Sequence, residues 1–164
     1  MMFDYMIRSA LPADVHSAAA VEAAAFPPAE AAPETAIAQR IALFPERFFV
    51  AETPEDGIIG IINGCASNKS LITDDMFETG GHDPRGKNQM IFGLAVLPRY
   101  RRLGVGGALL ERMISFAAQS GMSRVILTCK EEKLHFYAGF GFENAGISAS
   151  VHGGARWYDM IKTL

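Results

Sequence analysis

The sequence predicts a mixed α+β fold in which a mixed central β-sheet carries helices on both faces, a three-layer α/β/α arrangement. An apolar run, Met90–Leu97, is ended by Pro98 and suits a strand buried on both faces. A helical pattern follows a glycine-rich turn and extends from Leu109 to Ala117. A second apolar run, Arg124–Cys129, comes next. Strand, helix and strand in this order predict a parallel pair joined by a right-handed crossover.

The chain before this unit predicts one strand, two helices and a hairpin. Residues 5–7 form a short apolar strand, and a helix opens at residues 12–14 and ends before the two prolines that follow Phe26. A second helix begins at Pro33 or Glu34 and ends at Pro45, because proline suits only the first turn of a helix. Residues 48–51 and 58–65 read as paired strands around a turn that contains Asp56-Gly57.

Residues 66–87 form a long polar stretch, and a stretch of that length inside a compact domain usually has a function or is mobile. Met76 and Phe77 in its middle are expected to form a short helical turn that packs back. Near the C-terminus, residues 134–140 predict a short helix. Residues 142–150 and 156–161 predict two last strands. We therefore expect a single domain that spans residues 1–164.

Composition excludes several classes of protein. The chain has 164 residues, 49% of them hydrophobic, and a net charge of −3, so nucleic acid is not an expected partner. Cys65 and Cys129 lie far apart without metal-ligand spacing, which favours buried thiols in a reducing, cytoplasmic setting. We expect no bound metal, no signal peptide and no membrane span. Both a monomer and a homodimer stay open.

The turn after the first apolar run has the properties of an anion site. It contains Arg101, Arg102 and three glycines, Gly104, Gly106 and Gly107, just before a helix. Glycines let the backbone approach a ligand, and the first N–H groups of a helix lack partners within it. We therefore expect the N–H groups from Leu103 through Val105 to Gly107 to bind a diphosphate, with both arginines at its edge.

The pattern Arg101-x-x-Gly104-x-Gly106 matches neither the nucleotide P-loop nor a dinucleotide fingerprint. After an apolar strand it resembles the acetyl-coenzyme A motif, R/Q-x-x-G-x-G/A, of the GNAT N-acetyltransferases. The competing interpretation is an ordinary strand–turn–helix unit whose glycines serve tight packing.

The resemblance extends over most of the chain. The segment from Phe136 to Phe142 resembles the Tyr-x-x-x-Gly-Phe signature of the family. Residues 22–26, Pro45-Glu46, His82-x-Pro84-x-Gly86, residues 94–96 and Leu127-x-Cys129-x-Glu131 resemble its arylalkylamine (serotonin) N-acetyltransferases. The resemblance implies a GNAT-type fold and the cofactor acetyl-CoA. Its implied site residues are Leu94, Ala95 and Val96 along the pantetheine, Tyr137 as the acid for the leaving thiolate, and Phe26, Pro27 and Phe92 around the substrate.

One departure from that subfamily concerns the proton of the amine. The arylalkylamine enzymes place a His-x-His pair on the central strand, and the aligned residues here are Met90 and Phe92. We therefore expect either a relay through water to a remote group such as His82 or Glu22, or selection of the neutral amine. We interpret the four histidines as structural and Cys129 as a core thiol.

The expected function is transfer of an acetyl group from acetyl-CoA to a small, arylalkylamine-like primary amine by direct attack, without an enzyme nucleophile. Asp74, Asp75 and Glu78 keep a polyamine acceptor open, because carboxylates at a pocket mouth attract cations. A peptide N-terminus is a further alternative. A non-catalytic domain that senses acyl-CoA is the alternative outside the enzymes, since a fold and a ligand site do not by themselves establish catalysis.

Overall fold

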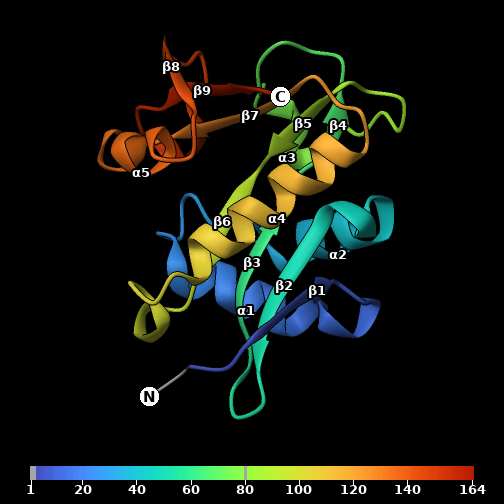
Figure 1. The fold of residues 1–164 in the computed structure, drawn as a ribbon. Coiled ribbons are helices and arrows are strands. Elements are labelled where there is room, and N and C mark those ends of the chain that lie inside the picture. The colour runs from blue at the N-terminus through green and yellow to red at the C-terminus, as the bar shows by residue number, and fades with distance from the viewer. Residues whose placement is uncertain (1–2, 80) are drawn as a thin grey trace.

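The computed structural model describes residues 3–79 and 81–164, whose strands form two sheets (Figure 1). The first sheet is antiparallel throughout and has the order β1-β2-β3-β6. Its strands are β1 (Met6–Ser9), β2 (Phe48–Thr53), β3 (Gly57–Asn63) and β6 (Gly93–Val96). The second sheet has the order β4-β5-β7-β9-β8 and is mixed, with β5 and β7 parallel. Its strands are β4 (Ala66–Ser67), β5 (Asn88–Ile91), β7 (Arg124–Cys129), β8 (Glu143–Ile147) and β9 (Tyr158–Thr163).

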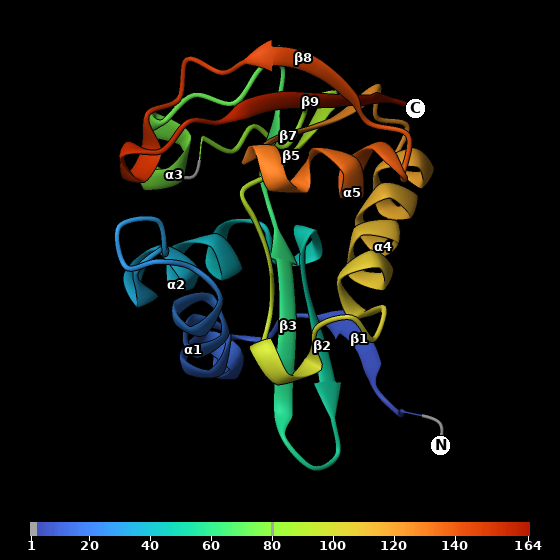
Figure 2. The ribbon, with the colours of Figure 1, turned by 90° about the vertical axis from the view of Figure 1, so that its left-hand side faces the viewer.

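Helices cover both faces of the first sheet. The helices α1 (Val15–Ala25) and α2 (Glu34–Leu43) lie on one side of β3, and α4 (Val105–Gln119) lies on the other (Figure 2). Two short helices, α3 (Asp75–Thr79) and α5 (Leu134–Ala138), lie beside the second sheet. The predicted fold class, α+β with helices on both faces, is confirmed, but the strands are divided between an antiparallel sheet and a mixed sheet instead of forming one mixed central sheet.

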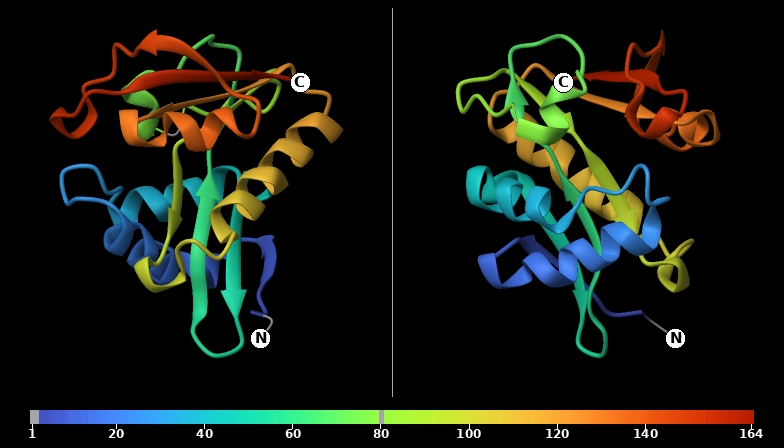
Figure 3. Two further views of the ribbon diagram at one scale, coloured as in Figure 1. Left: turned by 60° about the vertical axis from the view of Figure 1, so that its left-hand side comes forward. Right: turned by 180° about the vertical axis from the view of Figure 1, so that it is seen from behind.

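The central apolar run is divided, whereas the sequence predicts one strand over Met90–Leu97. Its first part, β5, pairs with β7 from Asn88↔Arg124 to Ile91↔Leu127, as the predicted crossover requires. Its second part, β6, pairs with β3 instead. Phe92 lies between them and donates its N–H to the Asn63 carbonyl at 2.8 Å. Because β6 is the last strand of its sheet, its other edge is left open where the chain diverges from β7 (Figure 3).

Most other boundaries follow the sequence signals. The strand β7 has the predicted bounds, α2 begins directly after Pro33, and α1 ends at the residue before Phe26. The strand β8 is shorter than the predicted 142–150, and β9 has the predicted length but lies two residues later in the chain. The polar stretch of residues 66–87 contains α3, in which Met76 is 1% exposed. The predicted helical turn that packs back is therefore present.

The core is built on both faces of β2 and β3. On one face α4 buries Leu109, Leu110 and Met113 completely, as its apolar pattern predicts. On the other face Ile37 and Ile41 of α2 pack with residues of α1. Among the described residues, no helix has the length and apolar character that crossing a membrane requires.

Replacement of Leu109 by alanine tests the contribution of this core. Leu109 is fully buried, so Leu109→Ala is expected to lower the free energy of unfolding by about 2–5 kcal/mol. Glu111→Ala, at an exposed position of the same helix, is the matched control and is expected to change it by less than about 0.5 kcal/mol. Urea denaturation measures both values. Equal effects of the two replacements would contradict this account of the core.

Candidate active site

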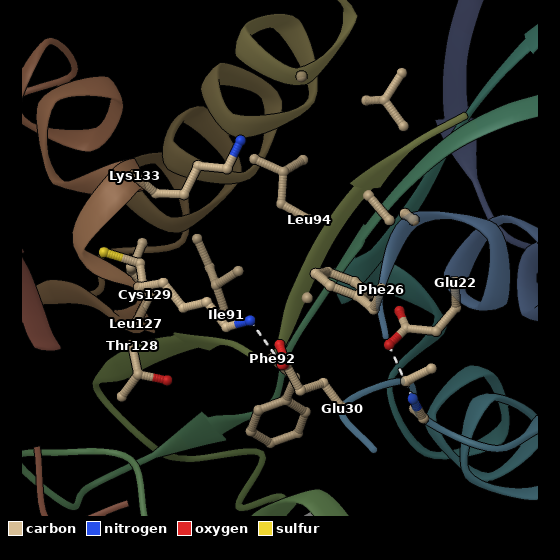
Figure 4. Close-up of a pocket in the computed structure, with 18 of the residues that line it drawn as sticks. Glu22, Phe26, Glu30, Ile91, Phe92, Leu94, Leu127, Thr128, Cys129 and Lys133 are labelled. Carbon is tan, nitrogen blue, oxygen red and sulfur yellow. Dashed lines mark hydrogen bonds and ion pairs between the residues drawn. The ribbon is translucent and has the colours of Figure 1, made fainter. Parts of the chain in front are cut away.

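A cavity of about 940 Å³ opens where β6 diverges from β7. Its walls come from the turn before α4, the strand β6, the end of β7, the helix α5 and the loop between α1 and α2. In Figure 4, Glu22 and Phe26 lie on one side of this space, and Cys129 and Lys133 lie on the other. The cavity therefore joins segments that are more than 100 residues apart in the sequence.

Nearly all the residues that the sequence predicts for the site line this cavity. They are Phe26, Pro27, Phe92, Leu94, Ala95, Val96, Arg101, Arg102, Gly104, Val105, Gly106, Gly107 and Tyr137. Leu103 is not among the lining residues, and its side chain is exposed. Leu103 can therefore contribute to the site only through its backbone N–H.

The turn before α4 presents its backbone to the cavity. Gly104 has φ 86° and Arg102 has φ 63°, so two left-handed residues bend the chain into the first turn of the helix. A Cβ on Gly104 would meet no atom within 4 Å, and one on Gly106 would meet only Val96, at 3.8 Å. These two glycines therefore leave open space. Gly107 differs, because a Cβ there would lie 3.0 Å from the Phe140 ring, so the packing interpretation applies to it.

Tyr137 reaches the cavity from α5 and is 8% exposed. Within the described part of the chain its hydroxyl makes no hydrogen bond, whereas its ring contacts Phe136 and Phe142. Burial raises the pKa of Tyr137, so the hydroxyl keeps its proton at neutral pH. The group is thus a proton donor that faces a cavity.

Cys129 also lines the cavity, at the end of β7. Burial raises the pKa of its thiol to about 11, which keeps it protonated and poorly nucleophilic at neutral pH. Cys65 is likewise buried, and both cysteines are free thiols. These properties agree with the interpretation of Cys129 as a core thiol.

Aromatic rings form one end of the cavity. Phe92 lies with its ring centroid 5.4 Å from that of Phe77 in α3, and the guanidinium carbon of Arg40 lies 5.0 Å from the Phe92 centroid. The ring of His152 stacks on Phe77 at 4.8 Å. The long polar stretch thus contributes a ring to the cavity wall through α3.

Several charged and polar residues line the cavity although no pattern in the sequence indicates that they do. Lys130 forms an ion pair with Glu30 at 2.6 Å, which is a dashed line in Figure 4. His152 Nε2 donates to the Glu30 carbonyl at 2.8 Å, and Trp157 Nε1 donates to the His152 carbonyl at 2.8 Å. Together they fasten the loop after α1 to the second sheet. Such contacts join loops distant in sequence, where no periodicity reveals them.

Glu22 and Arg40 bring buried charge to the same end of the cavity. They are 4% and 3% exposed, and both line the cavity. One oxygen of Glu22 accepts the Ala32 N–H at 2.9 Å, and Arg40 donates to the side-chain oxygen of Asn63 at 3.1 Å. Burial raises the pKa of Glu22 and lowers that of Arg40.

The other histidines lie outside the cavity. His82 Nδ1 accepts the Ala66 N–H at 3.2 Å, and burial lowers its pKa. His82 does not line the cavity, so the structure does not favour it as the remote base that the sequence leaves open. His16 and His135 are exposed, as expected of structural or solvated residues.

Comparison with known proteins identifies the family. Residues 16–142 match the acetyltransferase (GNAT) family, and the chain belongs to that family. It is 27% identical over 111 residues to serotonin N-acetyltransferase of Mesocricetus auratus, an alignment that covers 67% of this chain and 53% of that protein. The chain thus spans about half the length of this curated relative.

Two solved structures show the same fold. The loading GNATL domain of CurA from Lyngbya majuscula has a TM-score of 0.84 at 18% identity, and each chain is covered over 98%. The GphF GNAT-like decarboxylase in complex with isobutyryl-CoA has a TM-score of 0.82 at 23% identity, with 96% of this chain and 98% of that chain covered. At these identities the likeness extends to the fold alone.

Proposed function

We propose that the protein is an acetyl-CoA-dependent N-acetyltransferase whose acceptor is a small primary amine with an apolar body. The observation that carries this proposal is the left-handed turn at Gly104, which opens onto the same cavity as the protonated hydroxyl of Tyr137. Membership of the GNAT family supports the reaction class. The likeness to serotonin N-acetyltransferase supports the class of acceptor.

Acetyl-CoA would extend through the cavity from the turn before α4 towards the end lined by Phe26, Pro27, Phe77 and Phe92, which we call the acceptor end. The N–H groups from Leu103 to Gly107 would hold the diphosphate, with Arg101 and Arg102 at its edge. The open edge of β6, at Leu94, Ala95 and Val96, would bind the pantetheine amides as an added strand. The GphF structure, of the same fold, contains isobutyryl-CoA, which supports an acyl-CoA ligand here.

The chemistry of the chain is that of direct acyl transfer. A bound thioester supplies an activated acetyl group, so no enzyme nucleophile is needed. Tyr137 donates a proton to the departing sulfur, because its hydroxyl is protonated and free of hydrogen bonds within the described residues. The thiol of Cys129, with its pKa raised to about 11, takes no covalent part.

The walls of the acceptor end support an apolar amine. Phe26, Pro27, Phe92 and Phe77 line it, and pockets for small molecules are mostly apolar with a few polar groups. A polyamine acceptor is the second candidate, because Asp74 and Glu78 also line the cavity. Carboxylates there attract extended cations.

The first prediction concerns the turn. Gly104→Val adds a side chain at the proposed diphosphate site and is expected to lower coenzyme A affinity at least about tenfold by calorimetry. Gly121→Val is the matched control, since Gly121 lies after the other end of α4, has φ 73°, and a Cβ there would meet no atom within 4 Å. Both variants bear a similar backbone strain. Unchanged affinity in a folded Gly104→Val protein would rule out this placement.

The second prediction concerns Tyr137. Tyr137→Phe keeps the ring and removes the proton, so kcat is expected to fall by about 100- to 10,000-fold. Tyr158→Phe on β9, outside the cavity lining, is the control and is expected to keep kcat. A thiol-release assay measures both. If Tyr137→Phe turned over within about twofold of wild type, Tyr137 would have a packing role only.

The third prediction concerns the acceptor. Tryptamine and phenethylamine are expected to exceed spermidine and an N-terminal peptide in kcat/KM by about tenfold or more, because the cavity wall is aromatic. The same thiol-release assay ranks the amines. The reverse order would replace the arylalkylamine assignment by a polyamine or peptide one. Coenzyme A binding without transfer to any amine would indicate a sensor.

A further inference from the structure

A second cavity, of about 340 Å³, adjoins the acceptor end of the first. The residues that line it come from α2, the residue before α2, and α3, and they are Pro33, Thr35, Ala36, Gln39, Phe77 and Glu78. Pro33, Phe77 and Glu78 also line the cavity of about 940 Å³, so the two spaces meet at these three residues. Phe77 is the aromatic residue of the three, and its ring is an apolar partition between the two cavities.

Three contacts fix the position of Phe77. The His152 ring stacks on the Phe77 ring, with centroids 4.8 Å apart and an interplanar angle of 27°. The Phe92 ring lies 5.4 Å from it and is tilted by 56°. Arg40 donates to the Phe77 carbonyl at 3.4 Å, which ties α3 to α2. Because packed side chains resist displacement, a ligand that pushed the ring aside would lose these contacts.

His152 is itself fixed by neighbouring segments. Its Nε2 donates to the Glu30 carbonyl at 2.8 Å. The turn that leads to it is bound to the residues before α3, because the Asp74 carboxylate accepts from the Ser150 hydroxyl and from the Val151 N–H. Figure 2 shows α3 beside this turn. Each oxygen of Asp74 thus has a partner within the protein, which weakens Asp74 as a contact for a polyamine.

We propose that Phe77 limits the length of the acceptor, and that His152 is a positioning residue that acts through Phe77. This inference rests on the proposed N-acetyltransferase function and narrows its substrate class to arylalkylamines with a short linker, such as phenethylamine. An amine whose nitrogen lies at the thioester extends its body towards the acceptor end, where the ring of Phe77 stops it. A longer body displaces Phe77 from its stack on His152 or stays partly outside the cavity.

Removal of the partition tests the length limit. Phe77→Ala joins the two cavities, and the test compares phenethylamine with 4-phenylbutylamine, which has the same groups on a longer linker. Wild type is expected to favour phenethylamine in kcat/KM by about tenfold or more, because a misfit of one methylene in an apolar pocket costs about 10- to 200-fold. In Phe77→Ala the longer body enters the second cavity, so this preference is expected to fall at least about tenfold.

Two variants separate the partition from packing. Phe77→Leu keeps an apolar side chain between the cavities and is expected to keep the wild-type preference within about threefold. Ile72→Ala removes a buried side chain from the cluster against which Phe77 packs, but Ile72 is not among the lining residues of either cavity. It is expected to lower stability and leave the preference unchanged. Coenzyme A affinity, measured by calorimetry, is expected to stay unchanged in Phe77→Ala, which also shows that this variant is folded.

His152 is tested through its effect on the same preference. His152→Ala removes the stacked ring, so the preference for phenethylamine is expected to fall by about threefold or more, but less than in Phe77→Ala. His152→Phe lacks the hydrogen bond to Glu30 but keeps a ring for stacking, and it is expected to restore the wild-type preference. The double variant Phe77→Ala/His152→Ala is expected to show the preference of Phe77→Ala alone, because residues that act as a unit are not additive.

The outcomes distinguish this inference from the function on which it rests. If a folded Phe77→Ala enzyme keeps the wild-type preference, or loses activity equally for both amines, the length limit is wrong while the acetyltransferase function stands. The same holds if wild type already prefers 4-phenylbutylamine. Additive effects in the double variant would show that His152 does not act through Phe77. If wild type transfers to no amine, both proposals fail.

Discussion

At Phe92 the central strand changes its hydrogen-bonding partner, and every part of the candidate site depends on that change. Before it, β5 pairs with β7 in the second sheet; after it, β6 pairs with β3 in the first. The divergence leaves the backbone of β6 unpaired along one edge and places the cavity between the sheets. The helix α4 then begins where its N-terminal turn meets this cavity, because its apolar face is fixed against β2 and β3.

The buried charges at the acceptor end cost stability, and the packing of the core does not require them. Burying Glu22 and Arg40 disfavours their charged forms, and no direct ion pair joins them among the described residues. Asn63, the Phe77 carbonyl and the Phe92 ring offset part of this cost for Arg40. A purely structural core would gain from apolar side chains at these positions. Buried ionisable groups with shifted pKa values in a cavity are instead typical of functional sites.

The sequence predicts the parts of the site that local chemistry determines. Gly104, Gly106 and the start of α4 follow from a contiguous turn, and Tyr137 follows from a short signature, so their cavity positions are foreseeable. The meeting of Glu22, Asn63 and Gly93 is different, because these residues come from α1, β3 and β6. Their meeting depends on the β3–β6 register, in which Asn63 faces Gly93. The break at Phe92 is equally hidden, since an apolar run shows burial but not the identity of the neighbouring strand.

The open edge of β6 also bears on how the protein avoids self-association. An unpaired strand edge is a template for another chain, and proteins protect such edges in several ways. The outer edge strands here use the common devices: β4 has two residues, Arg8 on β1 is bound to Asp14 and Glu52, and β8 carries an irregularity between Asn144 and Ile147. The edge of β6 lies instead inside a cavity, between the turn before α4 and the loop fastened by Glu30 and Lys130. Enclosure therefore protects the edge of β6 from pairing with another chain, as charge, shortness and irregularity protect the other edges. The cavity admits a slender molecule but excludes a polypeptide sheet.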